Sequence, residues 1–226
     1  MPSRFTIVSL LAAVAVASLA LPPTARADGD PERGRQLAYT CYGCHGIANY
    51  KNVYPTYSVP KLQGQHPEYL AMALAGYKAG ERAHSTMHAQ AATMSEQDMQ
   101  DIAAFLAGKP LQANPQANPQ VNPQVNPKPS KPEGKLPQKA GQLCVSCHGP
   151  DGIGILGQYP TLAGQHADYI ARVLHDYKAG ARKNPVMAGF VTDLSDGDIR
   201  ELAQYYSERK PGLSTAEHSM WFAQKK

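Results

Sequence analysis

The clearest chemistry in this sequence lies in two short segments that contain all four of its cysteines. Each segment has two cysteines separated by two residues and followed at once by a histidine. The segments are Cys41, Cys44 and His45, and Cys144, Cys147 and His148. Thiols at this spacing can add to the two vinyl groups of a haem, which places the adjacent histidine beside the iron. The pattern predicts two covalently bound haem c groups, with the histidines as proximal iron ligands.

Paired cysteines also occur in disulfides, redox-active dithiols and zinc sites. A disulfide or a thioredoxin-like dithiol does not account for the histidine that follows both pairs. Zinc ribbons bring two cysteine pairs within about 20 residues of each other, whereas 99 residues lie between Cys44 and Cys144. Haem attachment is the interpretation that uses every element of the two segments.

The first 27 residues have the pattern of a Sec-type signal peptide. Arg4 precedes an unbroken, weakly apolar run over 5–21, and Ala25-Arg26-Ala27 has the small-x-small pattern of a cleavage site. An uncleaved membrane anchor is the alternative, because the run approaches the shortest length that spans a bilayer. We expect export with cleavage after Ala27. Cleavage lowers the formal net charge from +4 to +2, which gives no reason to expect nucleic acid as a partner.

The two halves of the chain repeat each other at a shift of 100 residues. The repeated positions in the first half are Pro60, Leu62, Gly64, Gln65, His66, Tyr69, Tyr77, Lys78, Ala79, Gly80, Arg82, Met87, Ser95 and Asp98. Self-similarity over this length predicts two copies of one domain. The haem motifs are 103 residues apart, so the first copy has three extra residues between His45 and Pro60.

Each copy has the pattern of three helices joined by loops. We expect the first helix to begin at Asp30-Pro31 and to run into Cys41, with Pro137 in a similar role in the second copy. Pro67 opens a second apolar stripe of helical spacing, and Gly80 closes it. The repeated Ser95 and Asp98 fit a capping pair that opens a third helix. His66 and His166 precede the second helix of each copy and are interpreted as structural.

These patterns divide the chain into five parts. They are a signal peptide at 1–27, a first domain at 28–109, a linker at 110–136, a second domain at 137–210 and a tail at 211–226. The linker is rich in Pro, Asn and Gln, and proline recurs at every fourth position over much of it, which excludes a helix there. An extended linker of this length permits either separated or closely packed domains.

The axial position opposite each proximal histidine can hold a methionine, a second histidine or no protein ligand. Met87 and Met187 occupy equivalent positions in a predicted loop, and Met187 is the only methionine between the second haem motif and the tail. His84 and His88 flank Met87 as alternatives, but neither has a counterpart in the second half. The repeat therefore favours methionine in both domains.

The assembled residues resemble the cytochrome c4 family of class I cytochromes with two haems. The likeness rests on Cys-x-x-Cys-His, Pro-x-Leu-x-Gly-Gln-His-x-x-Tyr, Tyr-Lys-Ala-Gly-x-Arg, the shared methionine and Leu/Met-Ser-x-x-Asp, and it covers nearly all of 30–210. It implies an all-α fold of two tandem cytochrome c-like domains. It also implies axial ligation of one iron by His45 and Met87, and of the other by His148 and Met187.

By the same resemblance, the carbonyls of Pro60 and Pro160 orient the proximal histidines. The family implies a soluble or membrane-tethered periplasmic protein that passes single electrons towards terminal oxidases or other redox proteins. This chain departs from the family in its long linker and in its long loop at 49–57.

Electron transfer without substrate chemistry is the function that we expect, because histidine and methionine together leave no open iron position. Two other functions use similar haem domains: a haem subunit of a dehydrogenase complex, and a diheme peroxidase, which needs at least one open or labile iron. The repeated cations Lys78, Arg82, Lys178 and Arg182 fit contacts to haem propionates or to an acidic partner. A solvated face is the interpretation that we favour for them.

Overall fold

The computed structural model describes residues 29–108, 135–210 and 212–216. The predicted signal peptide at 1–27, nearly all of the predicted linker at 110–136 and most of the tail at 211–226 lie outside these ranges. Within the described ranges the elements are helical, and extended chain pairs only at three isolated β-bridges. The expected all-α fold of two helical domains is confirmed. No helix within the described ranges is both long enough and apolar enough to cross a membrane.

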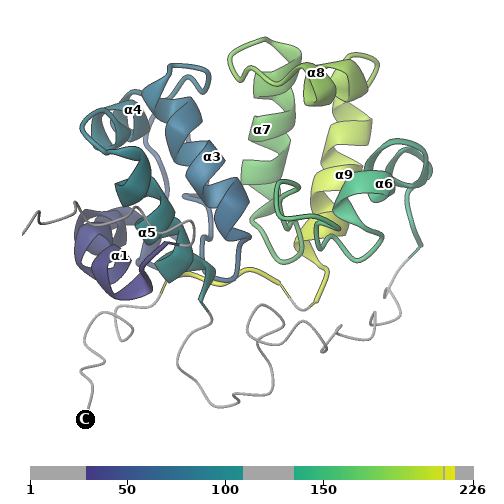
Figure 1. Cartoon of the computed structure of the whole chain (residues 1–226). Helices are drawn as coiled ribbons and strands as arrows, with labels where there is room; N and C mark the ends of the chain where they lie inside the picture. Colours follow the sequence, from purple (N-terminus) through teal and green to yellow (C-terminus); the bar gives the residue numbers. More distant parts are fainter. Residues whose placement is uncertain (1–28, 109–134, 211, 217–226) are drawn as a thin grey trace, which may run out of the picture.

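From the haem motif onward, the two domains repeat the same helices in the same order, and the first domain has α1 in addition (Figure 1). The first contains α1 (Pro31–Leu37), η1 (Ala38–Cys41), α2 (Tyr42–His45), α3 (Pro67–Lys78), α4 (Ser85–Ala91) and α5 (Glu96–Ala107). The second contains η3 (Ala140–Cys144), α6 (Val145–His148), α7 (Ala167–Lys178), α8 (Pro185–Val191) and α9 (Asp196–Ser207). The pairs α3 and α7, α4 and α8, and α5 and α9 are each offset by 100 residues, as the sequence repeat requires.

The helices begin and end at the residues that the sequence singles out. The Asp30 carboxylate accepts from the backbone N–H groups of Glu32 and Arg33 at the start of α1, which satisfies donors that have no partner inside the helix. Ser95 forms a reciprocal capping box with Asp98 at the start of α5, and the equivalent pair opens α9. Gly80, just beyond α3, has φ +71°, a value that favours glycine.

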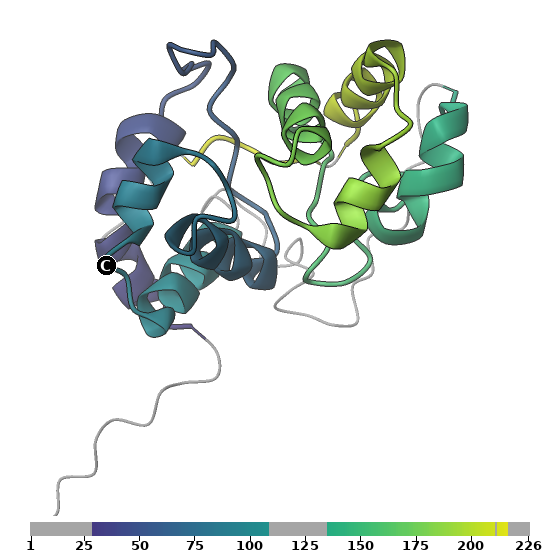
Figure 2. The same cartoon turned by 90° about the horizontal axis from the view of Figure 1, so that it is seen from above.

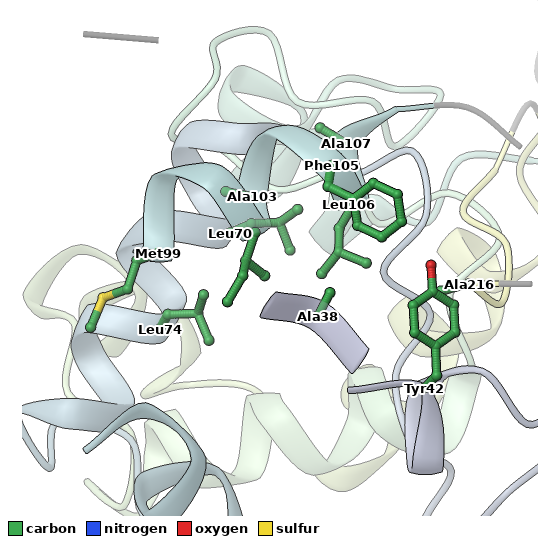
Figure 3. Packing of buried hydrophobic residues seen from close by; sticks show 11 residues of the cluster. Ala38, Tyr42, Leu70, Leu74, Met99, Ala103, Phe105, Leu106, Ala107 and Ala216 are labelled. Atoms are coloured by element: carbon green, nitrogen blue, oxygen red, sulfur yellow. The ribbon is translucent and has the colours of Figure 1, made fainter. Parts of the chain in front are cut away.

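The first core lies between α3, α5 and the segment that contains the first haem motif (Figure 3). Ile102, Phe105 and Leu106, all predicted from the apolar face of the third helix, are buried there. Helix α1 packs so closely on α5 that a Cβ at Gly34 would lie 1.9 Å from the backbone oxygen of Asp101. Glycine is required at this position because the two backbones touch.

The second core is formed by α7, α8 and α9 around Ile199 and Leu202, with Tyr205 and Tyr206 in an adjoining cluster. Its haem-motif segment differs from the first: the turns of η3 are π-helical, whereas those of η1 are 3₁₀. The expected continuous helix into each haem motif is therefore wrong in detail. The helix hydrogen bonding changes before the first cysteine in both domains.

The two domains lie against each other, with α3 beside α7 (Figures 1 and 2). The Gln65 side chain accepts from the Thr161 N–H at 2.8 Å and donates to the Thr161 carbonyl at 3.0 Å. Gln165 makes the repeat-equivalent pair: its side chain accepts from the Lys61 N–H and donates to the Lys61 carbonyl, each at 3.0 Å. The length of the linker allowed either separated or closely packed domains. In the structure, the two domains are packed against each other.

A second set of backbone bonds joins the ends of the loops that follow α3 and α7. The Ala83 N–H donates to the Ala181 carbonyl at 2.9 Å, and the Lys183 N–H donates to the Glu81 carbonyl at 2.7 Å. Between them, Arg82 and Arg182 form an isolated antiparallel bridge. The repeat-equivalent residues therefore meet around an approximate two-fold axis.

Candidate functional site

The two haem motifs occupy equivalent places in the two domains. All four cysteines have free thiols and are partly buried, so the disulfide alternative is not seen among them. Burial raises the pKa of the Cys41 thiol to about 11 and that of the Cys144 thiol to about 11. In the chain before haem attachment, these two sulfurs are therefore neutral thiols at physiological pH.

The histidine of each haem motif is held by one ring nitrogen. His45 Nδ1 lies 2.8 Å from the Pro60 carbonyl oxygen, and His148 Nδ1 lies 2.9 Å from the Pro160 carbonyl oxygen. A carbonyl can only accept, so Nδ1 carries the proton and Nε2 keeps its lone pair. Burial also lowers the pKa of both imidazoles, against the opposing effect of the carbonyl bond. The expectation that these proline carbonyls orient the histidines is confirmed.

The two methionines lie in short helices rather than in the loop that the sequence suggested. Met87 is the third residue of α4 and Met187 the third residue of α8. Their backbone N–H groups donate to side chains that cap these helices, to His84 Nδ1 at 3.3 Å and to Asn184 Oδ1 at 3.1 Å. The caps fix where each α4 or α8 helix starts and therefore which residue falls at the methionine position.

The cores bring each methionine together with its own haem motif. Met87 and Cys41 both pack against the first core, and Met187 and Cys144 both pack against the second. The structure thus places a cysteine of each haem motif and the repeat-equivalent methionine against the same core in each domain.

The alternative histidines have other contacts. His84 caps α4 and meets the Tyr77 ring edge-on at 6.3 Å between centroids. His88 Nδ1 lies 2.8 Å from the Tyr77 carbonyl oxygen. His66 Nε2 lies 3.2 Å from the carbonyl oxygen of Gly154 in the second domain. These contacts support structural roles for the three histidines.

The repeated arginines form a cluster that sequence reasoning placed wrongly on a solvated face. Arg182 is only 5% exposed, donates to the Tyr69 hydroxyl at 2.8 Å and stacks over the Tyr177 ring at 5.0 Å. Arg82 stacks over Tyr69 at 5.2 Å and over Tyr77 at 5.3 Å. The sequence feature that could have indicated this cluster is the recurrence of tyrosine and arginine at the same spacing in both halves.

This cluster also tests whether the site suits a haem. Within the described ranges, neither Arg82 nor Arg182 forms a salt bridge with a carboxylate, and the buried Nε of Arg182 has no hydrogen-bond partner. A buried cation without a counter-charge is costly, and the two propionates of a haem would supply that charge. Together with the thiol, imidazole and thioether donors, these cations fit two haem c groups.

Comparisons with known proteins agree with this arrangement. Residues 31–109 match the family described as "Cytochrome c", and residues 138–205 match "Cytochrome C oxidase, cbb3-type, subunit III". Cytochrome c4 of Pseudomonas aeruginosa is 32% identical over 83% of this chain and 92% of the relative. A "thiosulfate dehydrogenase electron acceptor" of Stutzerimonas stutzeri is 28% identical over 75% of this chain and 79% of the relative.

A solved structure has a similar fold over most of the chain. Reduced recombinant cytochrome c4 from Pseudomonas stutzeri superposes with a TM-score of 0.59 at 29% identity, over 82% of this chain and 100% of that structure. Two cytochrome c domains with paired cysteines at 41/44 and 144/147 fit two covalent haem c groups. The chain belongs to the cytochrome c4 family of electron-transfer proteins with two haems.

Proposed function

We propose that the mature protein is a periplasmic carrier that passes single electrons between redox proteins. Cys41, Cys44, Cys144 and Cys147 would attach the two haems, and His45, Met87, His148 and Met187 would supply the protein ligands to their irons. Each bound haem supplies one iron that gains or loses one electron. The chain's own residues would hold that iron and keep water away from it.

The observation that carries this proposal is the repeated bond between histidine Nδ1 and a proline carbonyl oxygen, at 2.8 Å in one domain and 2.9 Å in the other. It leaves Nε2 available to the metal in both domains and raises the basicity of the ligand. Met87 and Met187 would supply a second protein ligand to each iron. A filled coordination sphere favours electron transfer over peroxidase chemistry, which needs an open position.

The interface between the domains supports electron passage from one haem to the other within the molecule. The paired glutamine bonds and the backbone bonds around Arg82 and Arg182 hold the two domains in one arrangement. The buried Arg182 and the partly buried Arg82 at that interface suit the anionic edges of two haems. A fixed arrangement keeps the haem-to-haem distance constant, which a mobile pair of domains would not.

The proposal also includes the redox proteins that exchange electrons with this carrier. A terminal oxidase is the acceptor that we favour on the basis of the family. A dehydrogenase is the donor that a specific observation favours, because the Stutzerimonas stutzeri relative is described as an electron acceptor of thiosulfate dehydrogenase. The two assignments are compatible, since one carrier can accept electrons from a dehydrogenase and deliver them to an oxidase.

Visible spectra of single methionine variants test the ligand assignment. Met87→Ala and Met187→Ala should each remove about half of the methionine-to-iron absorption of the oxidised protein, because each affects one of two similar irons. The control is Met99→Leu, which changes a methionine that is buried in the first core and is not assigned to iron. A full-strength band in Met87→Ala or Met187→Ala contradicts the assignment for that domain.

The cellular role is tested separately. We expect the N-terminus of the protein isolated from a periplasmic extract to be Asp28. The reduced protein should be oxidised by membranes that contain a terminal oxidase and should not turn over hydrogen peroxide. Peroxide turnover with a high-spin haem spectrum would instead support the peroxidase alternative.

A further inference from the structure

The short segment at 212–216 crosses from the second domain to the first (Figures 1 and 2). The Leu213 N–H donates to the Ala163 carbonyl oxygen at 2.7 Å, inside the second domain. One residue later, Ser214 pairs with Gln63 of the first domain through two backbone bonds of 3.1 Å each. The segment therefore binds both domains, in addition to the covalent linker.

Comparison of the two domains shows which hydrogen bond of the second domain the Ser214–Gln63 pairing takes the place of in the first. Gln63 and Ala163 are equivalent residues, but their N–H groups donate to different parts of the chain. Ala163 donates at 3.0 Å to Gly152, which lies four residues after the histidine of its own haem motif. The residue four after His45 is Asn49, which is exposed. In the first domain, the acceptor is Ser214 from the tail.

The loop that contains Asn49 explains the difference. It carries the three extra residues of the first half, and it contacts α7 of the second domain, where Lys51 pairs with Asp168 and Tyr57 meets the Tyr169 ring. A loop that packs on the other domain leaves the edge at Gln63 without a partner from its own domain. A buried backbone group without a hydrogen-bond partner destabilises the fold, and the segment at 212–216 supplies the missing pair.

The end of the segment packs behind the first haem motif. Ala216 is 1% exposed and belongs to the first core together with Tyr42, which lies between Cys41 and Cys44 (Figure 3). A Cβ at Gly46, the residue after His45, would lie 3.1 Å from the Ala216 carbonyl oxygen. The segment at 212–216 thus contacts the haem-attachment segment.

Two glycines lie where the segment at 212–216 meets the second domain. A Cβ at Gly212 would lie 2.6 Å from the Gly164 Cα, and a Cβ at Gly164 would lie 2.8 Å from the Gly212 Cα. Gly64, the equivalent of Gly164, would have nothing within 4 Å of its Cβ. The two glycines at the crossing point let the backbones approach closely, and this close approach exists only on the side of the tail.

We propose that residues 212–216 are an intramolecular strap, which completes the first haem domain with a segment of the second and positions the first haem-attachment segment. The proposal rests on the haem assignments made above. The strap excludes water from Tyr42 and from the backbone around His45. Because water access stabilises the charged oxidised iron, the strap raises the reduction potential of the first haem and leaves the second unchanged.

Two truncations of the haem-loaded protein test the strap. Deletion of 212–226 removes it, and deletion of 217–226 is the matched control that keeps it. Hydrogen exchange measured by mass spectrometry should become about tenfold faster in the peptide 41–50 after the longer deletion. The peptide 144–152 should be unaffected, and the control truncation should exchange like the full chain.

A full-length variant guards against misfolding of the truncated chain. Gly212→Val places a side chain where the Gly164 Cα and the Ala163 carbonyl oxygen lie within 2.7 Å of the Cβ position, so it should displace the strap and reproduce the faster exchange at 41–50. Redox titration followed by NMR of each haem should then show a lower potential for the first haem alone.

The outcomes separate the strap from the haem assignment. Unchanged exchange at 41–50 in both strap variants overturns the strap, whatever the haem content. Faster exchange with unchanged potentials overturns its positioning role. Absence of haem from the first domain of the full chain defeats the proposed function, while the exchange experiment still reports on the strap. Equal shifts of both potentials mean that the whole molecule has loosened, which also contradicts the proposal.

Discussion

Replacement of Gln65 by methionine should open the contact between the two domains. The Gln65 side chain is 4% exposed and makes three hydrogen bonds, all to backbone groups. It accepts from Thr161 N–H at 2.8 Å and His66 N–H at 3.0 Å, and it donates to the Thr161 carbonyl at 3.0 Å. Methionine fills a similar volume but offers none of these bonds.

The size of the effect follows from the groups left unpaired. Each buried backbone donor or acceptor without a partner costs about 1–3 kcal/mol. Three such groups at the lower end, which allows for water entering the opened interface, give about 3 kcal/mol. Since 1.4 kcal/mol corresponds to a factor of ten, the open arrangement should become on the order of a hundredfold more populated.

Hydrogen exchange of the Thr161 amide, followed by NMR in the haem-loaded protein, measures this population directly. Gln63→Met is the matched control, because Gln63 is 1% exposed and neither polar atom of its side chain has a hydrogen-bond partner among the described residues. That variant loses no bond and should be neutral or more stable. Equal effects of the two substitutions would refute the reasoning that the bonds, rather than burial, hold the interface.

Two further predictions concern the first domain. Burial opposes ionisation of Asp101, but bonds from the Asp30 N–H and from Arg33 outweigh it and lower its pKa; its stabilising effect is full above about pH 4 and is lost as the pH falls further. Asp101→Asn should lower the free energy of unfolding at pH 7 by about 2 kcal/mol, as measured by thermal denaturation. Glu201 is the equivalent residue of the second domain and is exposed, so it should tolerate replacement by glutamine. Gly34→Val should separate α1 from α5 and cost about 3 kcal/mol; a melting temperature equal to wild type would contradict that contact.

The haem chemistry and the helices were predictable because they depend on local pattern. Cys-x-x-Cys-His specifies the attachment residues by spacing alone, and the capping pair at Ser95 and Asp98 specifies a helix start. The proline carbonyl that holds each histidine followed from the family resemblance. The repeat at 100 residues then transferred each prediction from one domain to the other.

The interface was not predictable because it depends on contacts between residues about 100 positions apart. Arginine at 82 and 182 looks solvated in a polar segment, and only the packing of α3 beside α7 buries the second of the pair. The position of Met87 in a short helix was also missed, because seven residues are too few for a clear apolar periodicity.

The crossing of the tail was beyond the sequence for a different reason. Ser214 and Ala216 carry no chemical signal, and their partners Gln63 and Tyr42 lie more than 150 positions earlier. A pairing of that kind is decided by which buried edge is left without a partner once both domains have folded. The repeat reveals it only by comparison, because the N–H of the equivalent Ala163 donates to the loop of its own domain.

The intact mass of the mature protein under denaturing and reducing conditions tests the central claim most directly. We predict the mass of the polypeptide from Asp28 plus two haem groups, with one addition lost in a variant that replaces Cys41 and Cys44 by alanine. A mass equal to the bare polypeptide, or two additions that persist in that variant, would contradict the presence of one thioether-bound haem in each domain.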